Sequence, residues 1–152
     1  PSPLATPRRA VVGWDSARLA MVLAVLDARC GLAMTGRDVY LNVTGGLRIA
    51  EPGADLAVAA ALVSSLTGNP VPEGTVLFGE IGLSGDVRPV AHAGLRLKEA
   101  AKLGFQSAWA PKSRGDAEEP ALAAVAIRHL TDLVDRIGGT DAVIELRERK
   151  VR

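Results

Sequence analysis

The sequence predicts an α+β fold from three features. Two stretches carry apolar residues at three- and four-residue steps, the pattern of a helix with one buried face. One begins at residue 15 or 16, and the other begins straight after the Pro-Gly turn at 52–53. The stretch 38–44 alternates apolar and polar residues, as a half-buried strand does. The Ser-Gly-Asp turn at 84–86 predicts a hairpin between 79–83 and 87–90. Because helices and strands mix without strict β-α-β alternation, we assign the α+β class.

The first elements follow from local signals. Residues 1–7 hold three prolines and are expected to be a linker, and residues 8–12 are a short strand candidate. The first helix is expected to end at Gly31, a residue type that favours the left-handed conformation found just after helices. Arg18 and Arg29 lie off its apolar stripe. That stripe consists of Leu19, Val22, Leu23, Leu26 and Cys30.

A glycine pair, Gly45-Gly46, follows the strand at 38–44 and is expected to bend the chain before an extended run at 47–49. Such a pair can also cradle phosphate, but here no helix stands directly behind it, so the structural interpretation is favoured.

The central helix then runs to Gly68, with Pro70 as its stop. Its buried stripe consists of Leu56, Ala59, Ala60, Val63 and Leu66.

The remaining elements complete one domain, which we expect over residues 8–139. Beyond the hairpin, a polar loop is expected at 111–120, and the tail at 140–152 is either a frayed helix or disordered. The other predicted elements are strands at 75–78, 108–110 and 124–127, a helix at 95–103, and a final helix that starts at Thr131 and ends before the glycines at 138–139.

Composition narrows the class of protein. The 152 residues are 48% hydrophobic and 23% charged, the balance of one globular domain. No apolar run reaches about 18 residues, so we expect no membrane contact and a cytoplasmic location. Cys30 is the single cysteine, which excludes an internal disulfide and a Cys-rich zinc site and predicts a buried, inert thiol.

The central turn and helix resemble the proteolytic domain of the Lon protease family, in which a Gly-Pro-Ser-Ala-Gly turn opens a helix that ends in Leu-Thr-Gly-Asn-Pro, found here at 66–70. Counted without gaps, the family's nucleophilic serine falls on Gly53 and its catalytic lysine on Arg96. Arginine stays protonated and cannot act as the base that a serine nucleophile needs. The resemblance implies a Lon-like fold, also that of the second domain of ribosomal protein S5, with a mixed sheet, packed helices and a pseudo-protease site. We therefore expect no enzyme activity in this chain.

A narrower resemblance covers most of residues 8–138. The chain is similar to the C-terminal Lon-like domains of the bacterial RadA (Sms) DNA repair family, in segments that keep the family's order. This family implies a hexameric ring that uses ATP to promote branch migration on DNA in homologous recombination, with the Lon-like domain serving ring assembly and DNA contact. The segments lie at 13–19, 24–29, 38–46, 54–57, 78–90 and 99–105.

The RadA resemblance also implies an ATPase core and a zinc finger ahead of this domain, in a longer parent chain. The sequence has no Gly-x-x-x-x-Gly-Lys-Ser/Thr phosphate loop and no Cys-x-x-Cys pair. ATP, magnesium and zinc are therefore expected in the parent, and no cofactor is expected in this fragment.

The first third of the chain is its basic part. Net charge is +1, yet residues 1–50 hold six arginines against three aspartates. We predict sequence-independent, salt-sensitive DNA contact through Arg8, Arg9 and Arg48, with Arg29 and Arg37 as weaker candidates. Ordinary solvated arginines or ion pairs between subunits are the alternative for each. No aromatic platform is expected beside them, so stacking on single strands is not predicted.

Two other functions stay open from the sequence. One is an oligomerisation scaffold without DNA contact. The other is an active peptidase with a shifted pair of catalytic groups, Ser84 or Ser64 with Lys98. The second is disfavoured because Gly53 stands at the turn that would present the nucleophile.

Overall fold

The computed structural model describes residues 2–3, 6–112 and 122–148, and of 140–148 only the backbone. In chain order the elements are β1 (Arg9–Val12), α1 (Ser16–Cys30), β2 (Val39–Asn42), the 3₁₀ turns η1 (Thr44–Gly46) and η2 (Pro52–Ala54), α2 (Asp55–Thr67), β3 (Thr75–Leu77), β4 (Glu80–Ile81), β5 (Val87–Arg88), α3 (Ala93–Lys102), β6 (Ser107–Ala110), β7 (Ala123–Ala126) and α4 (Leu130–Glu148).

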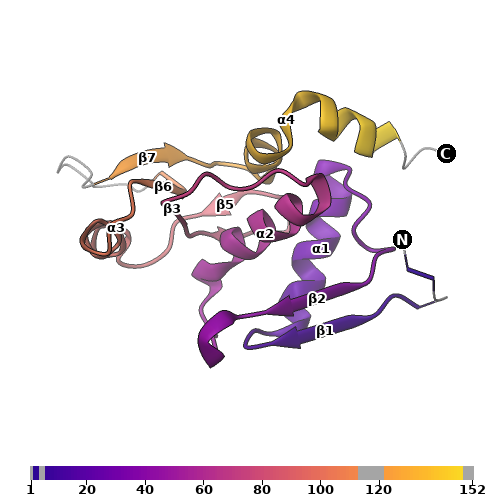
Figure 1. Cartoon of the computed structure of the whole chain (residues 1–152), viewed down its shortest axis with the longest axis horizontal. Coiled ribbons are helices and arrows are strands. Elements are labelled where there is room, and N and C mark those ends of the chain that lie inside the picture. The colour runs from indigo at the N-terminus through magenta and orange to yellow at the C-terminus, as the bar shows by residue number, and fades with distance from the viewer. Residues whose placement is uncertain (1, 4–5, 113–121, 149–152) are drawn as a thin grey trace.

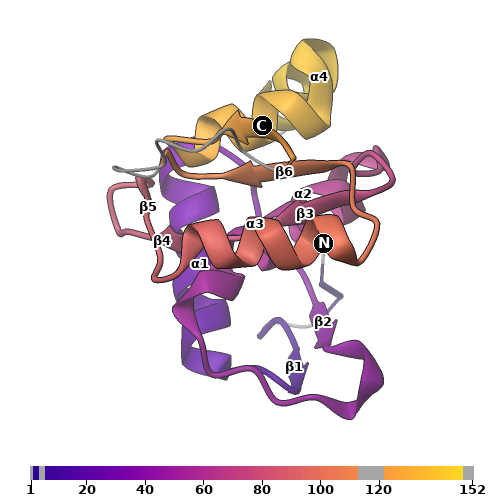
Figure 2. The same cartoon turned by 90° about the vertical axis from the view of Figure 1, so that its left-hand side faces the viewer.

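The strands form three small groups. β1 and β2 pair in parallel, with α1 as the crossover between them, and β3, β6 and β7 form a parallel sheet in the order β3-β6-β7. β4 and β5 form the predicted antiparallel hairpin. The mixture of helices and strands is confirmed, whereas the parallel pairings were not anticipated. In Figure 1 and Figure 2 the β1/β2 ribbon lies at the opposite end of the molecule from α4.

The ends of α1 and α2 confirm the local signals. The Asp15 side chain caps α1 by accepting the Arg18 N–H at 2.7 Å. Gly31 and Gly68 follow α1 and α2 in the left-handed conformation, with φ of 71° and 78°, which a side chain would disfavour. Pro52 begins η2, the turn that leads into α2.

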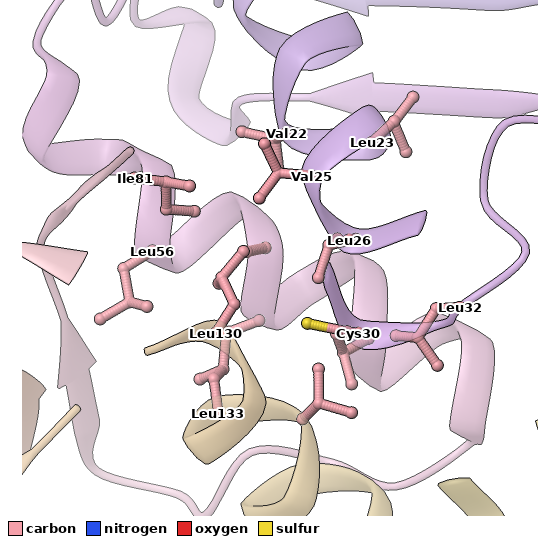
Figure 3. Close-up of a cluster of buried hydrophobic side chains, with 14 of the residues drawn as sticks. Val22, Leu23, Val25, Leu26, Cys30, Leu32, Leu56, Ile81, Leu130 and Leu133 are labelled. Atoms are coloured by element: carbon pink, nitrogen blue, oxygen red, sulfur yellow. The ribbon is translucent and has the colours of Figure 1, made fainter. Parts of the chain in front are cut away.

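The main core lies where α1, α2 and α4 meet. Figure 3 shows side chains of these helices converging with Ile81 of β4. Cys30 is buried among them, as predicted. A second cluster joins α3 to the β3-β6-β7 sheet through Phe78, Leu97 and Ala108. The packed helices thereby hold the start of α2 in a fixed position at the edge of the core.

Several boundaries differ from the prediction. α3 begins at Ala93, two residues early, and Gly45-Gly46 belongs to a 3₁₀ turn. α4 is interrupted at Gly139, whose angles are non-helical (φ 66°, ψ 156°), so its first segment stops at the glycines as predicted, and a second helical segment continues to Glu148. Residues 113–120 of the predicted loop and 149–152 of the predicted tail lie outside the described residues. Among the residues that are described, no helix is both long and apolar enough to cross a membrane.

Candidate functional site

The two positions singled out at the start of α2 and on α3 lie together. Gly53 is buried in η2 and lies against the Glu51 side chain. A Cβ added at Gly53 would be only 2.9 Å from Glu51 Oε1. Arg96 on α3 contacts the same Glu51 oxygen through Nη2 and donates from Nε to the Ala91 carbonyl at 3.0 Å. The Arg96 guanidinium also lies 5.9 Å from the centre of the Phe78 ring. One carboxylate therefore bridges the turn and α3.

Next to this turn is an ion pair that sequence reasoning missed, in which the Asp55 side chain is fully buried and the Arg18 side chain is 25% exposed. Asp55, fully buried in the first turn of α2, accepts from Arg18 Nε at 2.5 Å and from Nη2 at 2.6 Å. It also accepts the Ile81 backbone N–H at 3.0 Å. Arg18 Nη2 lies 3.6 Å from Glu80, and its hydrogen bond to Asp55 raises the Arg18 pKa. The pair ties α1, α2 and β4 together.

We call Arg18, Glu51, Asp55, Glu80 and Arg96 the paired-charge site. Each cation here faces a carboxylate of the same chain, so an external anion would have to displace an internal partner. Arg96 is permanently protonated and cannot serve as a general base. Asp55 lies in the first turn of a helix, where a negative charge is favourable, and it is also bound by Arg18, so its role is to stabilise the fold. Only its position inside an otherwise apolar stretch could have drawn attention to Asp55 in the sequence.

The residues of the alternative catalytic pair, Ser84 or Ser64 with Lys98, lie in a turn and in two helices. Ser84 lies in the β4/β5 turn, where its hydroxyl donates to Asp86, and this hydrogen bond is the main cause of a lowered Asp86 pKa. Arg88 Nε donates to the same carboxylate at 2.8 Å and lowers that pKa further. Ser64 lies within α2, and its carbonyl accepts the N–H of Gly68. Lys98 lies on α3.

Three of the predicted arginines meet at the start of the β1/β2 ribbon (residues 9–12 and 39–42). The Arg9 guanidinium donates to the carbonyls of Thr35 at 2.7 Å and of Arg8 at 3.1 Å, and it also contacts the carbonyl of Arg37. Arg37 Nε donates to the Ala33 carbonyl at 3.0 Å. Arg9 and Arg37 thus satisfy backbone carbonyls of the loop before β2, which is a structural role.

Arg8 and Arg48 are placed differently. Both side chains are exposed, and neither guanidinium forms a hydrogen bond or salt bridge with another described residue. The Arg8 backbone N–H donates to Asp38 at 2.7 Å, which is the main cause of the lowered pKa of Asp38. Arg29 stands apart from the ribbon at the end of α1, where its Nε lies 3.4 Å from the Leu83 carbonyl. The five predicted arginines therefore do not form one surface.

Within residues 2–3, 6–112 and 122–148, no group of three or more His, Cys, Asp or Glu side chains is placed to hold a metal ion. The sequence holds no Gly-x-x-x-x-Gly-Lys-Ser/Thr phosphate loop.

Comparison with known proteins gives consistent matches. Residues 14–114 match the family model described as subunit ChlI of Mg-chelatase. The DNA repair protein RadA of Brucella abortus (strain 2308) is 56% identical over 143 residues, covering 93% of this chain and 31% of the relative. The RadA proteins of Rickettsia conorii and Synechocystis are 59% and 42% identical, covering 69% and 95% of this chain and 24% and 31% of the relatives. The chain thus spans less than a third of these relatives.

These matches correct one prediction. From the replaced Ser-Lys pair and the missing phosphate loop we expected no enzyme. The match to a chelatase-subunit model and the RadA relatives instead point to an ATPase-type family, and so to an enzyme. The prediction was wrong because it judged activity only from catalytic motifs within these 152 residues, whereas the chain spans 31% of the Brucella relative.

Proposed function

Starting from the membership of this chain in the family described as subunit ChlI of Mg-chelatase, and from its homology to the DNA repair protein RadA, we propose that it acts in DNA repair and recombination as a DNA-contacting part of an ATPase-type enzyme. The observation that carries the proposal is the exposure of Arg8 and Arg48 at the β1/β2 ribbon without an internal hydrogen bond or salt bridge to a described residue. Such guanidinium groups are available to phosphates.

The proposal extends to assembly and architecture. In more detail, we propose that the chain forms a Lon-like domain and assembles into a homo-oligomeric, hexameric ring. We also propose that this ring promotes branch migration in the cytoplasm. A ring helps physically, because several copies of a modest basic strip add their phosphate contacts on one DNA molecule. ATP, magnesium and zinc would be held by residues of a longer parent chain. The domain limits of 8–139, with 1–7 as linker and 140–152 as tail, belong to the same proposal.

The structure narrows the arginines to be tested. Arg9 and Arg37 bond backbone carbonyls, and Arg29 lies beside the β4/β5 hairpin, so their removal would change the fold as well as the charge. Arg8 and Arg48 can be removed without breaking a side-chain hydrogen bond to a described residue. The proposed DNA contact therefore rests on these two.

The test is fluorescence anisotropy of labelled DNA at several salt concentrations, comparing the chain with Arg8→Ala/Arg48→Ala. We expect weaker binding and a salt slope lower by about one per lost phosphate contact. The control is Lys102→Ala/Arg128→Ala, which removes the same net charge from exposed positions on α3 and just before α4, together with the exposed ion pair between Lys102 and Glu99. No binding of the unchanged protein at low salt, together with a multimeric mass, would favour the scaffold without DNA contact.

A further inference from the structure

The outer face of the β1/β2 ribbon carries an exposed aromatic ring. The parallel register pairs Ala10 with Tyr40, so both side chains lie on one face, while the neighbouring Val11 and Leu41 lie on the other. Val11 and Leu41 pack against the core, whereas Tyr40 is 67% exposed and Val12 60% exposed. Strand pairing thus brings one exposed aromatic ring, Tyr40, beside the segment of Arg8 and Arg9, where no aromatic platform was expected.

Arginines border this outer face at both ends. Arg8 directly precedes β1 and, being two residues before Ala10, lies on the same side of the extended chain. Arg48 lies beyond the other end of β1, in a segment held there by the Ile49 N–H, which donates to the Gly13 carbonyl at 2.8 Å. Leu47, 63% exposed, belongs to the same segment. The face thus has an aromatic and aliphatic middle between two exposed cations.

A hollow of about 420 Å³ opens beside Tyr40, between β2 and α2, and its walls include Arg37, Tyr40 and Ser65. Val39 and Val43 donate their N–H groups to the β1 segment at 2.9 Å. Because backbone groups alternate in direction along a parallel ladder, the N–H and C=O of Tyr40 point away from β1, toward this hollow. An aromatic ring stacked on the Tyr40 side chain would therefore have the backbone N–H and C=O of Tyr40 near its edge, as a hydrogen-bond donor and an acceptor.

We propose that Tyr40 is a stacking platform for an unpaired base of single-stranded DNA, with Arg8 and Arg48 binding phosphates on either side of it. An aromatic ring stacks on any base, and flanking cations follow the backbone without regard to sequence. A duplex keeps its bases stacked on each other, so Tyr40 adds nothing comparable there. This site rests on the DNA contact proposed above and narrows it to single strands.

Charge favours nucleic acid over a second copy of the chain as the occupant of this face. The exposed guanidinium groups of Arg8 and Arg48 favour a polyanion, and in a two-fold contact the same patch would meet itself and bring the arginines of both copies together. In a head-to-tail ring the patch would instead meet a different surface of the next copy, and the mass measurement below tests that case. Asp38 is the acidic group at the Arg8 end: its carboxylate accepts the Arg8 N–H at 2.7 Å, and the charges of Arg8 and Arg9 also act on it. The phosphate path is placed along Arg8 and Arg48 because both guanidinium groups are exposed.

The experiment compares Tyr40→Ala, Tyr40→Phe and Leu95→Ala by anisotropy, each on a labelled single strand and on the duplex of the same sequence. We expect Tyr40→Ala to weaken single-strand binding on the order of 5- to 150-fold, the range for loss of one base-aromatic stack. Tyr40→Phe should retain binding because it keeps the ring. Leu95→Ala is the matched control, since Leu95 on α3 is 65% exposed.

Three outcomes would overturn the inference. The first is unchanged single-strand binding by Tyr40→Ala while Arg8→Ala/Arg48→Ala weakens binding, in which case the DNA contact stands and the stacking site fails. The second is an equal loss on both DNA forms, which would mean that Tyr40 does not distinguish single strands. The third is a change of mass in Tyr40→Ala without a change in binding, which would assign the face to a contact between copies. Binding of neither DNA form by the unchanged protein would remove the proposed function itself.

Discussion

The paired-charge site and the β1/β2 ribbon use arginine in opposite ways. At the paired-charge site Arg18 and Arg96 face carboxylates of their own chain, and Asp55 is fully buried. At the ribbon Arg9 holds backbone carbonyls, but Arg8 and Arg48 extend into solvent. An arginine whose guanidinium is hydrogen-bonded within its own chain thus stabilises the fold, whereas an exposed guanidinium without such a bond to a described residue is available to a partner.

The largest effect is expected from Asp55. Asp55→Ala leaves Arg18 without its main partner next to the core and should lower the free energy of unfolding by about 3–5 kcal/mol. Urea unfolding monitored by circular dichroism measures it. The control is Asp55→Leu with Arg18→Met, which removes both charges and should recover most of the loss. A loss below about 1 kcal/mol in the single variant would mean that the pair does not tie the helices together.

A smaller effect separates two neighbouring arginines on the ribbon. Arg9→Ala should lower the free energy of unfolding by about 1–2 kcal/mol, because it leaves loop carbonyls without their donor. Arg8→Ala should change stability by less than about 0.5 kcal/mol yet weaken DNA binding. Thermal unfolding and anisotropy on both variants test the contrast. Equal stability of the two variants would show that Arg9 is as free as Arg8.

The smallest effect concerns Asp86, in the hairpin next to the paired-charge site. Hydrogen bonds from Ser84 and then Arg88 lower its pKa in the folded state below the usual 3.8. A lowered pKa stabilises the fold above the unfolded value and loses that contribution as pH falls through the folded value. Because the Asp86 side chain is 39% exposed, the contribution should stay below about 1 kcal/mol.

Asp86→Asn measures this contribution. The stability difference between the unchanged protein and the variant should be present near about pH 6 and shrink toward zero near about pH 3. Urea unfolding across that range gives the difference. A difference that grows on acidification would contradict the assigned direction of the pKa shift.

Much of the helical structure was predictable because its signals are local. Asp15 and Gly31 bound α1, and the turn at 84–86 forms the expected hairpin. Strand pairing was less accessible, since short strands of three or four residues carry little information about their neighbours. The Gly53 and Arg96 positions were named from the resemblance, whereas the carboxylate of Glu51 that joins them became visible only in three dimensions.

The helix ends and the relationship to known proteins could be read from the sequence alone. Caps and helix-ending glycines depend on residues that are close together in the chain, and sequence identity is a count of matching residues. Which charged groups have a partner became visible only in the folded chain. Arg18 meets Asp55 across 37 positions, Arg9 meets Thr35 across 26, and Tyr40 joins the segment of Arg8 only through pairing of β1 with β2. These pairs cannot be read from the sequence because a hydrogen bond or an ion pair depends on distance in space, which folding sets between residues far apart in the chain.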